Sequence, residues 1–407
     1  MNVLFLCLSK VWDIKEREIY SDLLREFVKY GNNVFVVTPV ERKYNESTQL
    51  VDQGKAKILK VRTLNIQKTN LVEKGIGTFL IEFQYLSAIK KYFSGIHFDL
   101  TLYATPPITL VKPIKYIKKR DKAKTYLMLK DIFPQNAIDI GIMSKNGIKG
   151  LLYKIFRRKE KQLYALSDHI GCMSQANVDY VLMHNPEISP QKVEICPNSI
   201  EFVDMSLTES ERLDMRSKYD LPLDKKVFVY GGNLGKPQGI PFLIDCLRAE
   251  KESQDAFFLI VGDGTEYDKL HSFVSDEKPQ NVKLMKRLPK EDYDRLVAAC
   301  DVGMIFLDHR FTIPNFPSRL LSYMQAGLPV LACTDPNTDI GKTIEEGKFG
   351  WWCESNSVSG FKEIVSGIVD DNTDYSAVCI DYLKTYYSAN ITAERIVNSC
   401  HILINEI

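Results

Sequence analysis

The chain has 407 residues, of which 45% are hydrophobic, and its formal net charge is +1. This length accommodates two globular domains of about 150–200 residues each. No run approaches the roughly 18 consecutive apolar residues of a membrane-spanning helix, and the nine cysteines and six histidines lack C-x-x-C or H-x-x-x-H spacing. The composition therefore argues against an integral membrane protein, a disulfide scaffold and a zinc site, and it favours reduced core cysteines in a cytosolic protein.

The nearly neutral total conceals two halves of opposite charge. Residues 1–200 contain 31 lysines and arginines against 19 aspartates and glutamates, an excess of 12 positive charges. Residues 201–407 contain 22 against 33, an excess of 11 negative charges. The split indicates two domains that face different surroundings, although an ordinary solvated surface would also account for it.

The first half of the chain alternates apolar runs with helical segments. The run at 3–8 has no basic region or cleavage site beside it, so we expect a buried first strand and not a signal peptide. Amphipathic helices are predicted over 14–30 and 174–184. Apolar strands alternating with helices predict a parallel sheet that is covered on both faces.

After Asn198 the alternation stops and then restarts. Thr208 is suited to cap a charged helix over 208–219, and a turn-rich joint follows it. Six more strands are then predicted, with helices near 239–250, 265–275, 290–300, 317–326 and 340–346. We therefore expect an α/β protein made of two doubly wound parallel-sheet domains, whose strand ends face a ligand-binding cleft.

The predicted domain boundaries follow from this alternation. Residues 1–200 form the first domain and residues 201–372 the second. Residues 373–407 are predicted to be helices, with no strand after them. They either cap the second domain or return to pack on the first.

A glycine turn follows the first strand of the second domain. In "VFVYGGNLGKPQG" the strand ends at Gly231-Gly232, and a helix is predicted to begin near Gly239. Glycine lets a backbone approach a phosphate closely, and a helix N-terminus offers free N–H donors. Lys236 adds a positive charge. The turn is a candidate phosphate site, although such turns are also common as plain connections.

The stretch "FTIPNFPSRLLSYMQAGLPVLA" is the second candidate for an anion site. Pro317 and Ser318 suit the start of a helix, and Arg319 adds a guanidinium there. Gly327 ends the helix, and Pro329 prevents its continuation. The segment is expected to bind a diphosphate; a capped helix whose arginine meets only water is the alternative.

Metal ions are not expected at these sites. Asp292 and Asp294 have D-x-D spacing, but they fall within a predicted helix, where residues i and i+2 point apart. We therefore expect both to be surface residues.

Seven segments in chain order resemble the family 4 glycosyltransferases, which have the GT-B fold. "YGGNLGKPQG", "IVGDG", "FPSRLLSYMQAGLPVLA" and "FGWWC" resemble the donor domain of this family. "LKDIFPQNAIDIGIM", "LYALSDHIGCMSQANVDYV" and "VEICPNSIE" resemble its acceptor domain. The resemblance is greatest to members that build bacterial surface polysaccharides on lipid carriers.

The resemblance implies a retaining, metal-independent transfer of a sugar from a nucleoside diphosphate sugar, with no cofactor. The acceptor would be an oligosaccharide or a lipid-linked glycan at the inner face of the membrane. The diphosphate would bind in the second domain, and the base would lie near Arg287 and Leu288. The remaining positions that match the donor site are Gly231, Gly232, Asn233, Asn315, Ser318 and Arg319.

The chain departs from the family at two pairs of positions where many relatives have charged residues. Many relatives have Arg and Lys where Asn233 and Gln238 stand, so Lys236 and Arg319 are expected to supply the positive charge. Many relatives also have two glutamates where this chain has Pro314 and Ser322. The Ser322 hydroxyl would bind a ribose more weakly than a carboxylate does.

A carboxylate near the donor site could come from elsewhere. Asp335 and Asp339 follow the next predicted strand and are candidates for the missing carboxylate, with turn or cap residues as the alternative.

In the first domain, Asp131 follows a predicted strand in "KDIFP", at a place where relatives keep an acidic residue or a histidine. A carboxylate there would accept the proton of the acceptor hydroxyl or stabilise charge at the anomeric carbon. A turn-capping aspartate before Pro134 is the alternative. Closure of the two domains is expected to bring Asp131 to the donor and to exclude water.

A basic amphipathic helix is predicted within residues 147–166. Its apolar stripe, flanked by lysines and arginines, is typical of a helix at an anionic membrane surface. Packing of the stripe on the sheet is the alternative, and no nucleic-acid module is recognisable. The stripe consists of Ile148, Leu151, Leu152, Ile155 and Phe156.

Two other functions remain open at this stage. A nucleotide-sugar epimerase would use the same scaffold without an acceptor. A non-catalytic subunit would keep the fold after losing the donor site, and Asn233, Gln238 and Ser322 motivate that alternative.

Overall fold

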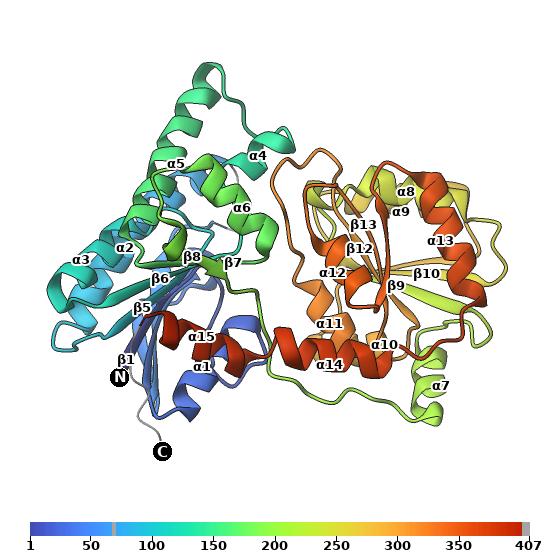
Figure 1. Ribbon diagram of the computed structural model, residues 1–407, viewed down its shortest axis with the longest axis horizontal. Helices are drawn as coiled ribbons and strands as arrows, with labels where there is room; N and C mark the ends of the chain where they lie inside the picture. The colour runs from blue at the N-terminus through green and yellow to red at the C-terminus, as the bar shows by residue number, and fades with distance from the viewer. Residues whose placement is uncertain (67–70, 401–407) are drawn as a thin grey trace. The chain divides into compact units, whose positions relative to one another are not determined.

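The computed structural model describes residues 1–66 and 71–400, which form two α/β units (Figure 1). The first unit comprises residues 1–201 together with the segment that begins at Ser388, and the second comprises residues 202–387. The chain therefore crosses between the units twice. The C-terminal helices are divided between them, because α14 (Ser376–Tyr386) belongs to the second unit and α15 (Ala389–Ser399) to the first.

The first domain is built on an eight-stranded sheet in the order β3-β4-β2-β1-β5-β6-β7-β8. All neighbours are parallel except β3 and β4, which form an antiparallel pair at one edge that the sequence patterns did not indicate. Its strands are β1 (Asn2–Leu6), β2 (Asn33–Glu41), β3 (Gln49–Gln53), β4 (Ala56–Thr63), β5 (Leu100–Ala104), β6 (Lys124–Leu129), β7 (His169–Cys172) and β8 (Val193–Ile195).

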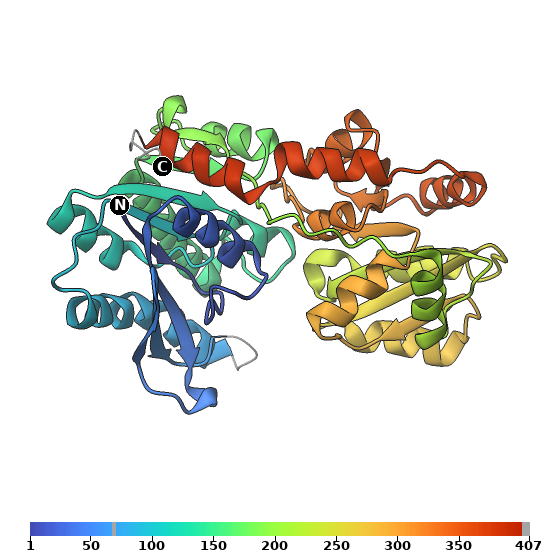
Figure 2. The same cartoon turned by 90° about the horizontal axis from the view of Figure 1, so that it is seen from below.

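Helices cover both faces of this sheet, as apolar strands require. Leu24 and Phe27 of α1 and Ile396 of α15 share one hydrophobic core with β1, β2, β5 and β6. The two helices lie side by side in both views (Figures 1 and 2). The helices of this domain are α1 (Ile19–Lys29), α2 (Leu71–Tyr92), α3 (Val111–Asp121), α4 (Gln135–Asp139), α5 (Gly147–Leu166), α6 (Gln175–His184) and α15. α3 packs against both α2 and α5.

The second domain has a six-stranded parallel sheet in the order β11-β10-β9-β12-β13-β14. Its strands are β9 (Lys226–Asn233), β10 (Ala256–Asp263), β11 (Val282–Met285), β12 (Val302–Phe306), β13 (Val330–Thr334) and β14 (Gly350–Glu354). The strand order reverses beside β9, so the carboxyl end of β9 is the topological switch point where such sheets bind ligands.

The helices of the second domain form two layers. Side chains of α8, α9 and α13 complete the core on one face, while α11 packs against β12, α10 and α14. The helices are α7 (Glu209–Lys218), α8 (Ile240–Ala249), α9 (Tyr267–Glu277), α10 (Lys290–Ala298), α11 (Arg319–Gln325), α12 (Ile340–Glu346), α13 (Val358–Asp370) and α14.

Several local expectations are confirmed. Thr208 caps α7 in a capping box with Glu211, whose side chain returns to the Thr208 backbone. The nine cysteines are all buried and none forms a disulfide. Within residues 1–66 and 71–400, no helix has the length and apolar content that crossing a bilayer requires.

Candidate active site

Two glycines at the end of β9 form the floor of the candidate donor site. Gly231 leaves no room for a side chain, because an added Cβ would lie 1.6 Å from the hydroxyl oxygen of Tyr293 on α10. Gly232 is exposed and has a φ of 123°, which favours glycine. Both glycines are therefore required by geometry, and Gly232 presents its backbone to solvent at the switch point.

Arg319, the first residue of α11, lies against this turn. Its guanidinium carbon is 4.2 Å from the centre of the Tyr230 ring. Its Nη2 is 3.6 Å from the position that a Cβ of Gly232 would take. The Nη1 atom is buried without a hydrogen-bond partner, and no carboxylate of the described residues forms an ion pair with Arg319. A partly desolvated guanidinium without a counter-ion favours the binding of an anion.

A second tyrosine, Tyr323, supports the glycine turn at the end of β9. The Tyr323 hydroxyl accepts a hydrogen bond from the Gly231 N–H at 3.2 Å and donates one to the Met304 carbonyl at 3.1 Å. Burial raises the pKa of Tyr323 to about 12, so the hydroxyl keeps the proton that it donates. Gly303 makes room for the ring, since an added Cβ would lie 2.3 Å from it.

Sequence analysis missed Tyr230, Tyr293 and Tyr323. A signal existed for Tyr323, because it follows Arg319 by four residues and so shares its helix face. No pattern in the sequence pointed to Tyr293, whose contact with Gly231 joins two distant segments.

The helix start at Ser318 differs from the expectation. Ser318 occupies the N-cap position of α11, but its side chain makes no capping hydrogen bond. Its φ of −67° and ψ of −14° are helical, whereas a capping residue needs an extended backbone. The predicted capping role of Ser318 is therefore wrong. Because α11 has only seven residues, the positive charge at its N-terminus comes from the Arg319 guanidinium.

Asn233 and Gln238, which replace the basic residues of relatives, bond to each other. The Asn233 side-chain amide donates to Gln238 Oε1 at 2.8 Å, and the Gly235 N–H donates to the same oxygen at 3.1 Å. These two side chains shape the turn after β9 and bring no charge. Lys236 is exposed beside them and has no ion-pair partner among the described residues.

The other predicted donor residues lie at the same edge of the sheet. Arg287 is exposed and Leu288 half-buried after β11, which is two strands from β9 and so about 10 Å away across the sheet. Asn315 and Ser322 are half-buried before and within α11. The Asn315 carbonyl accepts a hydrogen bond from Thr338, while its Nδ2 atom is buried without a partner.

Asp335 serves the loop after β13. Its Oδ1 atom accepts the N–H of Asn337 at 2.9 Å and of Thr338 at 3.2 Å, and the residue is fully buried. Asp335 is therefore a turn residue, which was the alternative to its role as a donor-site carboxylate. Burial raises the pKa of Asp335 to about 6. Asp339 precedes α12 at its N-cap position without a side-chain capping bond.

Asp131 follows β6 in the first domain. Asn136 donates through Nδ2 to both carboxylate oxygens at 2.7 Å, and the Thr105 hydroxyl accepts the Asp131 N–H at 3.4 Å. Burial raises the pKa of Asp131 to about 6, in spite of the hydrogen bonds from Asn136 that lower it. A carboxylate with this pKa is suited to exchange a proton near neutral pH.

Lys130 does not pair with its neighbour Asp131. Its Nζ atom donates to the Cys196 carbonyl at 2.9 Å, which ties the end of β6 to the loop after β8. Burial lowers the pKa of Lys130 to about 8.

A metal site is not found in the described residues, where no group of three or more His, Cys, Asp or Glu side chains could hold an ion. Asp292 and Asp294 lie on α10, as the predicted helix requires. Asp292 is accessible near Lys218, but Asp294 is buried and pairs with Lys290 at 3.2 Å, so the expectation that both are surface residues is wrong for Asp294.

Comparisons with known proteins found a family model, relatives and solved structures that resemble this chain. Residues 211–385 match the family model "Glycosyl transferases group 1". The chain is 24% identical to a probable glycosyltransferase, WbjE of Pseudomonas aeruginosa. The match covers 83% of this chain and 83% of the relative. It is 21% identical over 61% of its length and 60% of the relative's to a putative colanic acid biosynthesis glycosyl transferase, WcaI of Escherichia coli K12.

Among solved structures, the chain resembles Anabaena HepE in complex with UDP. The TM-score is 0.69 at 15% identity, with 98% of this chain and 100% of the other covered. The presence of two Rossmann-like domains in one chain is thus as the sequence patterns predicted.

Proposed function

We propose that this chain is a glycosyltransferase that uses a nucleoside diphosphate sugar, because residues 211–385 match the group 1 family model and the fold resembles that of HepE. The sugar would pass to a glycan or lipid-linked acceptor in the synthesis of a surface polysaccharide. The WcaI relative is named for colanic acid biosynthesis, and the HepE structure contains UDP. The transfer is proposed to be retaining and independent of a metal ion.

The observation that carries this proposal is the state of Arg319. Its guanidinium lies beside the exposed Gly232 backbone, has one buried nitrogen without a partner, and is not neutralised by a carboxylate of the described residues. A diphosphate supplies the acceptor oxygens and the negative charge that this arrangement lacks.

The proposed chemistry assigns one bond change to each domain. In the second domain, the bond between the anomeric carbon and the phosphate oxygen breaks, and Arg319 and Lys236 offset the charge on the departing diphosphate. In the first domain, Asp131 accepts a hydrogen bond from the acceptor hydroxyl, whose oxygen forms the new bond to the anomeric carbon. The proton leaves through Asp131 or through the departing phosphate oxygen.

The remaining donor residues are divided between the diphosphate and the nucleoside. We place the diphosphate near Asn315 and Ser318, the ribose near Ser322, and the base near Arg287 and Leu288. The uncharged Asn233–Gln238 pair orders the turn beneath the diphosphate. Replacement of a ribose-binding carboxylate by the Ser322 hydroxyl makes the expected nucleotide affinity lower than that of relatives with a glutamate there.

Calorimetric titration tests the donor proposal directly. The full chain is titrated with UDP, GDP and dTDP, and one of them is expected to bind well above the others. Failure of all three to bind would overturn the assignment of the Gly232–Arg319 site.

Nucleotide-sugars are then screened with lipid-linked acceptors. Isomerisation of a donor sugar without any acceptor would instead show an epimerase.

We also propose that the protein works at the cytoplasmic face of the membrane as a peripheral protein. The excess of 31 lysines and arginines over 19 acidic residues in residues 1–200 supports this location, because anionic leaflets attract such segments. A lipid-linked acceptor would also be found there.

A further inference from the structure

Two helices of the first domain expose large apolar side chains to solvent. Exposed fractions of 38% to 63% are found at six positions, and Leu151 has the highest. On α2 the three positions are spaced by four and three residues, which places them on one helix face. We call these six residues the apolar patch: Ile76, Leu80, Phe83, Leu151, Leu152 and Ile155.

The two halves of the apolar patch belong to neighbouring helices (Figure 1). The rings of Phe79 on α2 and Phe156 on α5 stack with centroids 5.3 Å apart, and Lys159 pairs with Glu82 at 2.8 Å. Phe156 is thus buried between the helices, contrary to the continuous stripe predicted for α5, and the side chain of Ile148 is outside the described part of the structure.

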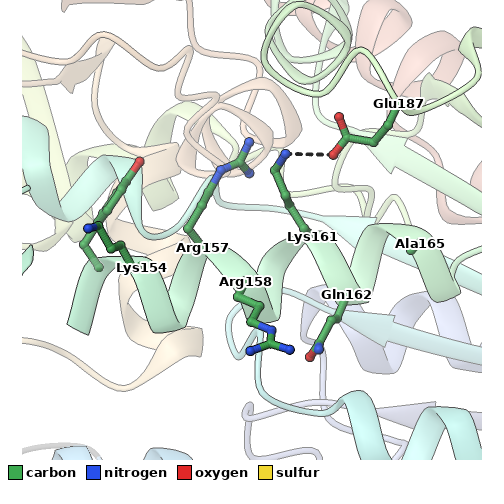
Figure 3. A pocket seen from close by; sticks show the side chains of 8 residues that line it. Lys154, Arg157, Arg158, Lys161, Gln162, Ala165 and Glu187 are labelled. Carbon is green, nitrogen blue, oxygen red and sulfur yellow. Dashed lines mark ion pairs between the residues drawn. The ribbon is translucent and has the colours of Figure 1, made fainter. Parts of the chain in front are cut away.

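Exposed basic side chains lie on α5 and beside Phe83 of α2, next to residues of the apolar patch. Lys112 holds its ammonium 3.5 Å from the centre of the Phe83 ring. Lys149, Lys154 and Arg158 are exposed on α5, and no described carboxylate pairs with any of these four. In Figure 3, Arg158 points away from Glu187, whereas Lys161 pairs with that glutamate at 2.9 Å.

The acidic residues of α2 and α5 pair with other basic residues and so do not neutralise these four cations. Glu73 pairs with Arg42, Glu82 with Lys159 and Glu160 with Arg157. No other aspartate or glutamate occurs in α2 or α5. The surface around the apolar patch therefore has a net positive charge.

We propose that the apolar patch is a docking surface for a bilayer of anionic phospholipids. Its leucine, isoleucine and phenylalanine side chains enter the boundary between headgroups and acyl chains, and Lys112, Lys149, Lys154 and Arg158 meet the phosphates. Lysine is depleted in protein–protein interfaces, which disfavours a second protein as the occupant. The proposal defines the contact behind the proposed peripheral location, and it is independent of nucleotide binding.

Co-sedimentation with vesicles tests this surface. The full chain is mixed with vesicles of phosphatidylcholine alone or of phosphatidylcholine with phosphatidylglycerol. We expect binding only to the anionic vesicles, with a fraction that persists at high salt because apolar contacts are not screened. The double variant Leu151→Asn/Ile155→Asn should weaken binding about tenfold or more. The α2 variant Ile76→Asn/Phe83→Asn should do the same.

Matched controls separate docking from folding. Leu223→Asn removes a side chain in the second domain that is 56% exposed, and it should leave vesicle binding unchanged. Each variant must keep the nucleotide affinity of the parent chain. Equal binding of parent and patch variants, or no binding by the parent, would overturn the proposal. It would also fail if the patch variants lost a concentration-dependent dimer and the parent bound no lipid.

Discussion

In the first domain, cationic side chains without acidic partners among the described residues lie on an exposed surface. In the second domain, a single such cation, the guanidinium of Arg319, is partly buried. Lys149 and Lys154 are solvated, so each contributes only about 1 kcal/mol near an anionic surface and they act together. Arg319 has lost part of its water and has no counter-ion among the described residues, so one ligand anion can gain several kcal/mol there. Total charge therefore does not locate a binding site in this proposal, since the proposed anion site lies in the acidic domain.

The largest effect is expected at Asp131. Asp131→Asn should lower kcat by roughly 1,000-fold, because an amide cannot take the proton of the acceptor hydroxyl. Nucleotide affinity should stay within about twofold, because Asp131 is assigned to the acceptor hydroxyl and not to the nucleotide. Steady-state transfer kinetics and titration measure the two quantities. A variant that lost nucleotide binding but transferred at the parent rate would reverse the division of roles.

Arg319→Ala tests the second domain. We expect nucleotide affinity to fall by about 100-fold, because the diphosphate loses its charge-assisted partner. Arg248→Ala is the matched control, since that arginine is exposed and already pairs with Glu277. Titration with the preferred nucleotide gives both values, and equal losses in the two variants would argue against a specific diphosphate site.

The pH dependence of transfer should come from the first domain. The pKa of Asp131 is raised to about 6, and only the ionised form can accept a proton. The rate should therefore fall about tenfold for each pH unit below about 5 and level off above about 7. The Asp131→Asn variant should not show this step. A parent profile that is flat from pH 5 to pH 8 would contradict the role of Asp131 as a base.

Tyr323→Phe probes the support of the glycine turn. The variant leaves the Gly231 N–H and the Met304 carbonyl without their hydroxyl partner, which should cost about 1–3 kcal/mol of folding free energy. Nucleotide affinity should fall about tenfold or less, because Arg319 remains. Denaturant unfolding and titration measure the two effects. Unchanged stability would mean that the hydroxyl does not support the turn.

The smallest effect is expected at the capping box of α7. Thr208→Ala should lower the free energy of unfolding by about 1 kcal/mol, because the Glu211 N–H loses its capping oxygen. Catalysis and nucleotide binding should not change. An unfolding free energy that did not change in Thr208→Ala would contradict the observed cap geometry.

Local chemistry accounts for what the sequence alone determined. Alternating apolar runs predicted both parallel sheets, and Thr208 at the start of a charged segment predicted the cap of α7, because such signals involve neighbouring residues. The glycine pair 231–232 and Arg319 were also recognisable as candidates for an anion site, which stays a prediction. The antiparallel β3–β4 edge was not foreseen.

Tertiary contacts decided the rest. The clash that makes Gly231 obligatory comes from Tyr293, some 60 residues away in the chain. Asp335 became a buried turn residue because two backbone N–H groups face it. Phe156 was buried by Phe79, whereas Leu151 was left exposed. Periodicity determines which side chains share a helix face, but only the packing of distant segments decides whether that face meets protein or solvent.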